Sequence, residues 1–337
     1  MSFNQILPQI LLYYGYIVLP IGIISNIFSI LILSQKTQRR MTINFYLTAL
    51  SVSDVFVLSI CLVDKWLRFV YNIRIRNTSI FLCKALPFSD KTFLSLSSWI
   101  IAIITTERAI AVSSPLGHNF TRNRKKVKNF CVLFIAIFVI GLVYSPVLFY
   151  YKFTERIIAN NETSKTICHE IEPEIYERVK YVIFYCMFCF IPQIVCTVCV
   201  YFIVKHLLER RKFLTSQSQI HDDHINQNNR NMGLILSINI LFFVFTVPFS
   251  LTGMLITFTD KTTEFHKDLV PIYTFVHLFS YTNSVLNFFV YIASGSSFRR
   301  EFTNMCRKVN TKQSFKDSLK TVSSRLTPTS SSSYRIS

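Results

Sequence analysis

A few polar side chains interrupt long apolar stretches of this sequence, and these are the groups that could do chemistry inside them. Asp54 stands in the middle of one stretch and Ser97 in another. A lone carboxylate in a membrane costs roughly 2.5–3.5 kcal/mol on insertion scales, so it requires polar partners. The amides and hydroxyls available to it are Asn26, Ser97, Asn283, Ser284 and Asn287. We therefore predict a buried polar cluster around Asp54.

An acidic and a basic residue stand side by side near the end of a further apolar stretch. Glu107 and Arg108 lie in the run 85–113, which begins just after Cys83. A charge pair at the mouth of a membrane helix is costly and is usually retained for a function. We therefore treat Arg108 as a candidate functional residue.

The elements that must position these groups are seven apolar segments, each long enough to cross a hydrocarbon core of about 30 Å as a helix. They cover residues 12–34, 42–63, 85–113, 129–151, 181–204, 232–258 and 269–293. Charged residues make up only 16% of the chain, and residues 1–35 contain none, which excludes an ordinary soluble domain. The first segment is too long for a signal-peptide core, so we expect it to be retained. The sequence predicts an all-α membrane protein, a seven-transmembrane helix bundle.

The basic residues predict how the bundle is oriented. Lys and Arg near the ends of spans favour the cytoplasm, and they concentrate in loops 35–41, 114–128 and 205–231 and in the tail from 296. We expect an extracellular N-terminus and a cytoplasmic C-terminus in the plasma membrane. The formal net charge of +18 is dispersed among the spans. It therefore predicts contact with membrane lipid and cytoplasmic partners, and no nucleic acid.

Cysteines and glycosylation signals fit this orientation. Cys83 and Cys168 are the two cysteines predicted to face outside, where disulfides persist, and we predict a bond between them. Asn161 and Asn77 begin acceptor sequons for N-glycosylation on outer loops, although Asn77 is close to the membrane. Asn119 fits the same pattern on the cytoplasmic side, where we expect it to stay unmodified.

The segment after the last span predicts a short amphipathic helix on the inner surface. Phe298 and Phe302 are four residues apart on one face, and the helix reaches Cys306, a candidate palmitoylation site. We divide the chain into a short extracellular N-terminus (1–11), a seven-transmembrane domain with this helix (12–306) and a disordered cytoplasmic tail (307–337). The serines and threonines of this Ser-rich tail are candidates for phosphorylation, and the alternative is a passive solvated tail.

The order and spacing of several motifs resemble those of rhodopsin-like (class A) G-protein-coupled receptors over most of the chain. Each motif alone is weak, but their joint order is specific. The matching segments are Gly22 to Asn26, Leu50 to Asp54, Cys83 followed by Glu107-Arg108-Ala109, the prolines Pro146, Pro192 and Pro248, Asn287 to Tyr291, and Phe298-Arg-Arg.

The resemblance implies a sodium ion within the polar cluster. Its oxygen ligands would come from Asp54, Ser97, Asn283, Ser284 and Asn287 in the resting state. Oxygen ligands alone suit a hard cation. The alternative is a water-bridged hydrogen-bond cluster that holds no ion. No other cofactor is expected.

The resemblance also implies a conformational switch that couples to a heterotrimeric G protein. Glu107 would restrain Arg108 at rest, and Arg108 would line the G-protein cavity on activation, with Tyr291 supporting the open form. The residues assigned to coupling and switching are Glu107, Arg108, Tyr291, Asn287, Phe242 and Pro248. An extracellular agonist would act through its greater affinity for the active state. The receptor makes and breaks no bond, so it is not an enzyme.

Departures from the family pattern predict a modified switch. Ala109 stands where Tyr is usual, Thr246 replaces the helix 6 tryptophan, and Phe288 replaces the helix 7 proline. The acidic residue expected low on helix 6 falls near Asn228 and is absent. We expect a weaker restraint on the resting state, measurable basal signalling, and a straighter seventh helix.

The candidate ligand site lies at the outer ends of the helices. Asp90 follows Cys83 by seven residues, and the resemblance places it opposite Tyr281 in the ligand cavity. We assign ligand contacts to Asp90, Tyr281, Asp64 and Phe249. A biogenic-amine receptor would use Asp90 as the counter-ion of an ammonium group. The alternative is that Asp90 merely pairs with a lysine.

The outer loops favour a peptide ligand. Residues 152–180 contain six glutamates around Cys168, which suit a basic or amidated peptide. The run 283–302 also resembles invertebrate neuropeptide receptors, including those for FMRFamide-type ligands. A visual pigment is disfavoured because the seventh span has no lysine for a Schiff base. We rank a neuropeptide receptor first and a biogenic-amine receptor second.

Overall fold

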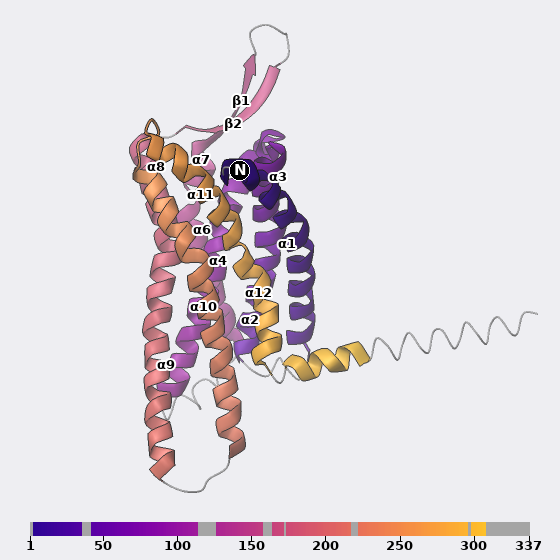
Figure 1. The fold of residues 1–337 in the computed structure, drawn as a ribbon, viewed down its shortest axis with the longest axis vertical. Helices are drawn as coiled ribbons and strands as arrows, with labels where there is room; N and C mark the ends of the chain where they lie inside the picture. The colour runs from indigo at the N-terminus through magenta and orange to yellow at the C-terminus, as the bar shows by residue number, and fades with distance from the viewer. Residues whose placement is uncertain are drawn as a thin grey trace, which may run out of the picture.

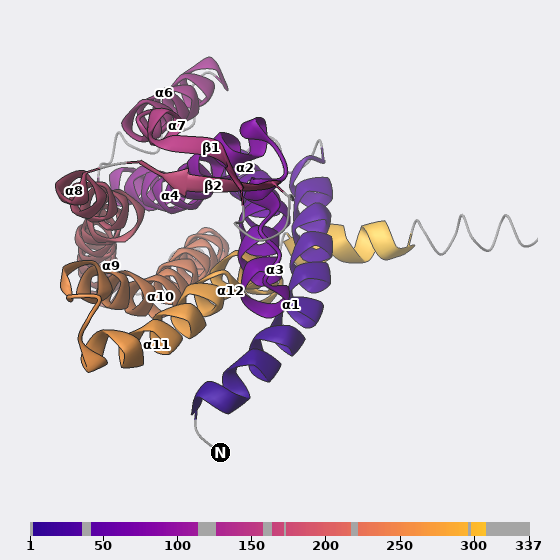
Figure 2. The ribbon, with the colours of Figure 1, turned by 90° about the horizontal axis from the view of Figure 1, so that it is seen from above.

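The computed structural model describes residues 3–35, 42–113, 126–157, 164–171, 173–216, 222–295 and 298–307. Figure 1 shows long helices running roughly side by side, and Figure 2 shows them end-on around a common interior. The helices of the bundle are α1 (Phe3–Leu33), α2 (Thr42–Phe56), α3 (Val63–Tyr71), α4 (Ile80–Ser113), α6 (Lys126–Tyr144), α8 (Glu174–Tyr185), α9 (Ile191–Ser216), α10 (Asp222–Phe258), α11 (Glu264–Ser280) and α12 (Thr282–Ser294).

Six helical stretches of the described residues are long and apolar enough to cross a membrane. They are Ile6–Leu33, Ile43–Tyr71, Ile80–Ser113, Val127–Tyr150, Ile175–Glu209 and Met232–Phe258. The seventh crossing consists of α11 and α12 in succession, so the predicted seven-helix bundle is confirmed. Numbered in chain order, helices 1 to 7 of the bundle are α1, α2 with α3, α4, α6, α8 with α9, α10, and α11 with α12. The first helix begins already at Phe3, inside the segment 1–11 that we had predicted as an N-terminal extension.

The seventh crossing is continuous around Phe288, where the family proline is missing, and its interruption lies elsewhere. Helical hydrogen bonding is interrupted at Tyr281, between Ser280 and Thr282. The N–H of Tyr281 bonds to the carbonyl of Leu278, three residues back, which tightens the chain locally. The phenol of Tyr281 is held by Asp90 of α4, 3.3 Å away. A tertiary contact therefore accompanies the break where no proline does.

Helices 2 and 5 each contain a wider turn. A π-helical segment, η1 (Val57–Leu62), joins α2 to α3, and η3 (Cys186–Phe190) joins α8 to α9. Pro192 follows η3 and has no N–H to donate to the preceding turn, which accounts for the altered hydrogen bonding there.

One end of the bundle, here named the disulfide end, carries a β-hairpin and a disulfide bond. Strand β1 (Tyr151–Ile157) follows the short α7 (Val147–Tyr150) and pairs antiparallel with β2 (Ser164–Glu170). Cys83 of α4 is bonded to Cys168 of β2, as the sequence predicted. The hairpin projects from the top of the bundle in Figure 1.

The opposite end, here named the tail end, carries a final helical segment over residues 298–307 that runs across the bundle axis (Figure 1). Phe298 packs against Phe288 and Tyr291, with ring centroids 5.9 and 5.7 Å apart. Phe302 contacts Phe28 and Phe288. The apolar face of this helix is therefore attached to helices 1 and 7.

Candidate functional site

Asp54 is the centre of a buried polar cluster, and its side chain is completely buried. The amide nitrogen of Asn287 donates to one carboxylate oxygen at 2.8 Å. The hydroxyl of Ser97 lies 3.2 Å from the other oxygen, and Ser53 is 2.8 Å from Ser97. The helices that bring these groups together are α2, α4 and α12, so the cluster joins three parts of the chain.

Several amide oxygens of this region have no hydrogen-bond partner among the residues that the structure describes. They belong to Asn283 and Asn287, both buried on α12, and to Asn26, whose amide nitrogen donates to the carbonyl oxygen of Ser284. Burying an acceptor without a partner is costly unless water or a cation completes it. Orphaned oxygens beside a carboxylate are chemically suited to a sodium ion.

Arg108 lies at the tail end of α4, partly exposed and next to Glu107. Among the described residues no ion pair links these two side chains, because neighbouring residues on a helix do not face each other. The restraint that the resemblance implied is therefore not seen between them. Ala109, which replaces the usual Tyr, is buried against Val112, Ile203 and Met232.

A contact that sequence reasoning missed joins the same helix to α10. The amide nitrogen of Asn239 donates to the hydroxyl of Thr105 at 3.0 Å, and the thiol of Cys196 on α9 lies 3.9 Å from that hydroxyl. All three side chains are buried. The available signal was Asn239 itself, an amide in an apolar span. These groups form a polar bridge between helices 3, 5 and 6.

The predicted switch residues of helix 6 lie in the core. Phe242 is fully buried, and its carbonyl oxygen accepts a hydrogen bond from the hydroxyl of Thr246 at 2.6 Å. Phe249, predicted to contact ligand, is 1% exposed and stacks on His277 with ring centroids 4.4 Å apart. Rings of Phe184 and Phe188 pack against it. Any ligand contact of Phe249 would need entry into this aromatic layer.

Asp90 is neutralised within the protein. The ammonium group of Lys65 on α3 lies 2.9 Å from one carboxylate oxygen of Asp90, and the hydroxyl of Tyr281 donates to the other at 3.3 Å. The contact between Asp90 and Tyr281 is as the resemblance implied. The ion pair with Lys65 corresponds to the alternative in which Asp90 pairs with a lysine.

The other predicted acidic contact is also paired. Asp64 is bound by Arg76 at 2.9 Å. Arg76 follows α3, in the connection that contains the short helix η2 (Ile75–Asn77). Asp90 is therefore available to a cationic ligand only if it gives up an internal partner, whereas the second carboxylate oxygen of Asp64 has no hydrogen-bond partner among the described residues.

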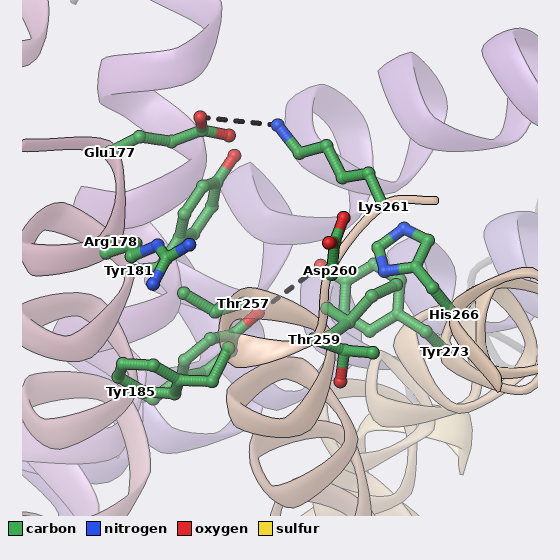
Figure 3. A pocket seen from close by; sticks show the side chains of 12 residues that line it. Glu177, Arg178, Tyr181, Tyr185, Thr257, Thr259, Asp260, Lys261, His266 and Tyr273 are labelled. Atoms are coloured by element: carbon green, nitrogen blue, oxygen red, sulfur yellow. Dashed lines mark hydrogen bonds and ion pairs between the residues drawn. The ribbon is translucent and has the colours of Figure 1, made fainter. Parts of the chain in front are cut away.

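A cavity of about 690 Å³ opens at the disulfide end between α8, α10 and α11. Figure 3 shows Glu177, Arg178 and Tyr181 on one wall and Asp260 and Lys261 on the other. Glu177 and Lys261 form an ion pair across it at 3.5 Å. The N–H of Thr262 donates to Asp260, and this bond lowers the pKa of the Asp260 carboxyl, which keeps it ionised.

The floor of this cavity contains two tyrosine hydroxyls. Tyr185 of α8 donates to Tyr273 of α11 at 3.5 Å (Figure 3). Tyr185 can lie there because its phenol packs directly on Gly253, where any side chain would collide with it. The cavity is thus polar at its mouth and ends on the aromatic layer around Phe249.

The predicted modification sites differ in exposure, and one of them is not described by the structure. Asn161 lies outside the described residues. Asn77 is partly exposed, and its amide oxygen accepts a hydrogen bond from the N–H of Cys168 at 3.1 Å. Cys306 is exposed with a free thiol. Glycosylation and palmitoylation at these positions stay predictions.

A family comparison agrees with this geometry. The sequence profile described as "7 transmembrane receptor (rhodopsin family)" matches residues 25–291, from the first helix to the end of the helix 7 motif. The chain belongs to the rhodopsin family of seven-transmembrane receptors. Like other members of this family it is a multi-pass membrane receptor that signals through heterotrimeric G proteins, and not an enzyme.

Individual relatives of this rhodopsin-family receptor are distant. A QRFP-like peptide receptor from Branchiostoma floridae is 20% identical, with 85% of this chain and 74% of the relative aligned. The C-C chemokine receptor type 1 of Homo sapiens is 25% identical, with shares of 88% and 78%. Galanin receptor type 1 of Rattus norvegicus is 22% identical, with shares of 87% and 82%. These are proteins that the receptor resembles.

Proposed function

We propose that this protein is a peptide receptor of the plasma membrane, and one observation carries the choice of ligand class. Asp90 would be the counter-ion of an amine, but it is held by Lys65 at 2.9 Å and by Tyr281. A small amine would have to displace an ammonium group that is already in place. The biogenic-amine alternative is therefore the weaker one.

The cavity at the disulfide end suits a larger and more polar ligand. Its volume of about 690 Å³ and its rim of charged side chains are adequate for several residues of a peptide. Relatives named as a QRFP-like peptide receptor and as galanin receptors support this ligand class. Of the glutamates in residues 152–180, Glu170 forms an ion pair with Lys180 and Glu177 with Lys261. Because these carboxylates already have internal cations, they attract a basic peptide less strongly than the sequence indicated.

We place the disulfide end outside the cell and the tail end in the cytoplasm. The cytoplasmic loops and tail would then carry the basic residues, as the positive-inside rule requires. Peptide binding at the outer cavity would favour an arrangement in which Arg108 contacts a G protein. Receptor kinases and arrestin would act on the tail, membrane lipid would surround the apolar faces, and a sodium ion at Asp54 would favour the resting state.

The test is to express the receptor in cells and record calcium and cyclic AMP against neuropeptides and biogenic amines. We expect responses to peptides and not to amines. The matched variant is Asp90→Asn, which keeps the shape of the side chain. A response to amines alone that Asp90→Asn abolishes would establish the amine receptor instead.

A further inference from the structure

Lys91 is a buried cation that the structure does not neutralise. Its side chain is 7% exposed, and among the described residues no carboxylate lies within ion-pair distance of its ammonium group. The adjacent acid, Asp90, is on a different face of α4 and pairs with Lys65. A lysine is rarely buried without an anionic partner, because an ammonium group loses its hydration there.

The surroundings of Lys91 are aromatic. Its ammonium group lies 4.9 Å from the ring centroid of Phe184 and 5.2 Å from that of Tyr181. A cation over a ring gains about 0.5–2 kcal/mol. Removal of an ion from water costs several kcal/mol, so the rings compensate only part of it.

The other charges of this region leave an excess of one buried cation. Asp90 is bound by Lys65, Asp64 by Arg76, and Glu170 by Lys180 at 2.7 Å. The ammonium group of Lys180 also lies over the ring of Tyr181, 4.8 Å from its centroid. Two ammonium groups thus share one ring, and only that of Lys180 has a carboxylate among these contacts.

The position of Lys91 connects it to the outer cavity. Tyr181 lines the cavity (Figure 3), and its ring is also a wall of the Lys91 site. A ligand in the cavity is therefore separated from the ammonium group by the width of one side chain. Reorientation of Tyr181 would let an anionic group reach it.

We propose that Lys91 is an anion site that binds a carboxylate of the ligand. The inference rests on the proposed function only in assigning this carboxylate to a peptide, as an acidic side chain or a free C-terminus. A single ammonium group between two rings matches a monoanion, and a carboxylate attached to an apolar or aromatic residue fits this cage. This adds a specific acidic feature to a ligand that the sequence had suggested to be basic or amidated.

A first experiment needs no peptide. The full-length receptor is purified in detergent, and its thermal unfolding is followed with phenylacetate or with the neutral phenylacetamide at equal concentration and ionic strength. We expect phenylacetate to raise the unfolding temperature of the wild type and phenylacetamide to have no such effect. The rise should be absent in Lys91→Met and, as a second variant, in Lys91→Gln. Equal shifts with both compounds, no shift with phenylacetate, or a shift retained without Lys91 would overturn the proposal.

The same measurement without additive provides a matched control. Lys91→Met removes a charge that lacks a partner, so we expect an unfolding temperature higher by about 2 °C or unchanged. Lys65→Met removes the partner of Asp90 and should lower it. If Lys91→Met lowers the temperature as much as Lys65→Met does, Lys91 is already satisfied and the proposal is wrong.

A second experiment uses any peptide that activates the receptor. Its Asp and Glu residues are changed to Asn and Gln one at a time, and its C-terminal acid is exchanged for an amide. We expect Lys91→Met to raise the half-maximal effective concentration of the unmodified peptide at least tenfold. For the one analogue that lacks the carboxylate bound by Lys91, the same variant should cause no such rise. Lys91→Arg should retain the response to the unmodified peptide. Anion binding without any peptide response would refute the peptide function alone, and peptide responses insensitive to Lys91 would refute the anion site alone.

Discussion

The polar bridge between Thr105 and Asn239 predicts how easily the receptor signals without ligand. The hydrogen bond spans 3.0 Å between α4 and α10, and both side chains are buried. A cavity that admits a G protein at the tail end requires helix 6 to separate from helix 3, and this separation breaks the bond. Thr105→Val removes the hydroxyl with little change of shape, and Asn239→Leu removes the amide.

The magnitude follows from the type of bond. A neutral hydrogen bond contributes about 0.5–1.5 kcal/mol net, and about 1 kcal/mol changes an equilibrium roughly fivefold. An active fraction near 1% would rise to about 5%. Because Thr105 and Asn239 share this bond, the free-energy effect of the double variant should be smaller than the sum of the two single-variant effects.

The assay is basal G-protein signalling, normalised to receptor at the cell surface. Ser98→Ala is the matched control, because the hydroxyl of Ser98 is also buried on α4 but bonds to Leu94 within its own helix. We expect Thr105→Val and Asn239→Leu to raise the basal signal several-fold and Ser98→Ala to leave it unchanged. Basal signals equal to or below the wild type in both variants would refute the reasoning.

Three further predictions concern the predicted sites. Wild-type basal signalling should exceed that of Arg108→Ala, since no ion pair links Arg108 to Glu107; equal signals would show that the resting state is well restrained. Replacing an organic cation of the assay buffer by sodium should lower basal signalling in the wild type. It should not do so in Asp54→Asn, because a neutral amide binds sodium poorly. A wild type whose basal signalling is insensitive to sodium would favour the water-bridged cluster. Lys65→Met should destabilise the receptor by about 3 kcal/mol in thermal unfolding, because it leaves Asp90 buried without its cation. Adding Asp90→Asn should recover most of that loss, and a double variant as unstable as Lys65→Met would contradict the pairing.

Much of the fold could be read from local properties of the sequence. The crossings follow from the lengths of the apolar runs, since only a helix satisfies its own backbone in a membrane. The bond between Cys83 and Cys168 followed from the side of the membrane on which each cysteine lies. The contacts of Asp54 with Asn287 and of Asp90 with Tyr281 followed from motif positions.

Other features depended on helix packing. The break at Tyr281 could not be predicted from composition, because it involves a contact with Asp90 and no proline. The bridge from Asn239 to Thr105 required knowing which face of each helix turns inward. Position along a span does not reveal this when the helix is apolar on nearly all sides.

The sequence by itself determined that this chain is a membrane receptor, because the apolar runs, the charge bias and the motif spacing are one-dimensional properties. Only the tertiary structure decided which charges meet. Lys65 and Lys91 are both buried or nearly buried, and each follows an aspartate in the sequence. The ammonium group of Lys65 nevertheless pairs with Asp90 of another helix, whereas that of Lys91 lies over aromatic rings. The rotation and packing of helices 2, 3 and 5 set these distances. The electrostatic free energy of a buried charge depends on whether an oppositely charged group lies within a few ångströms of it.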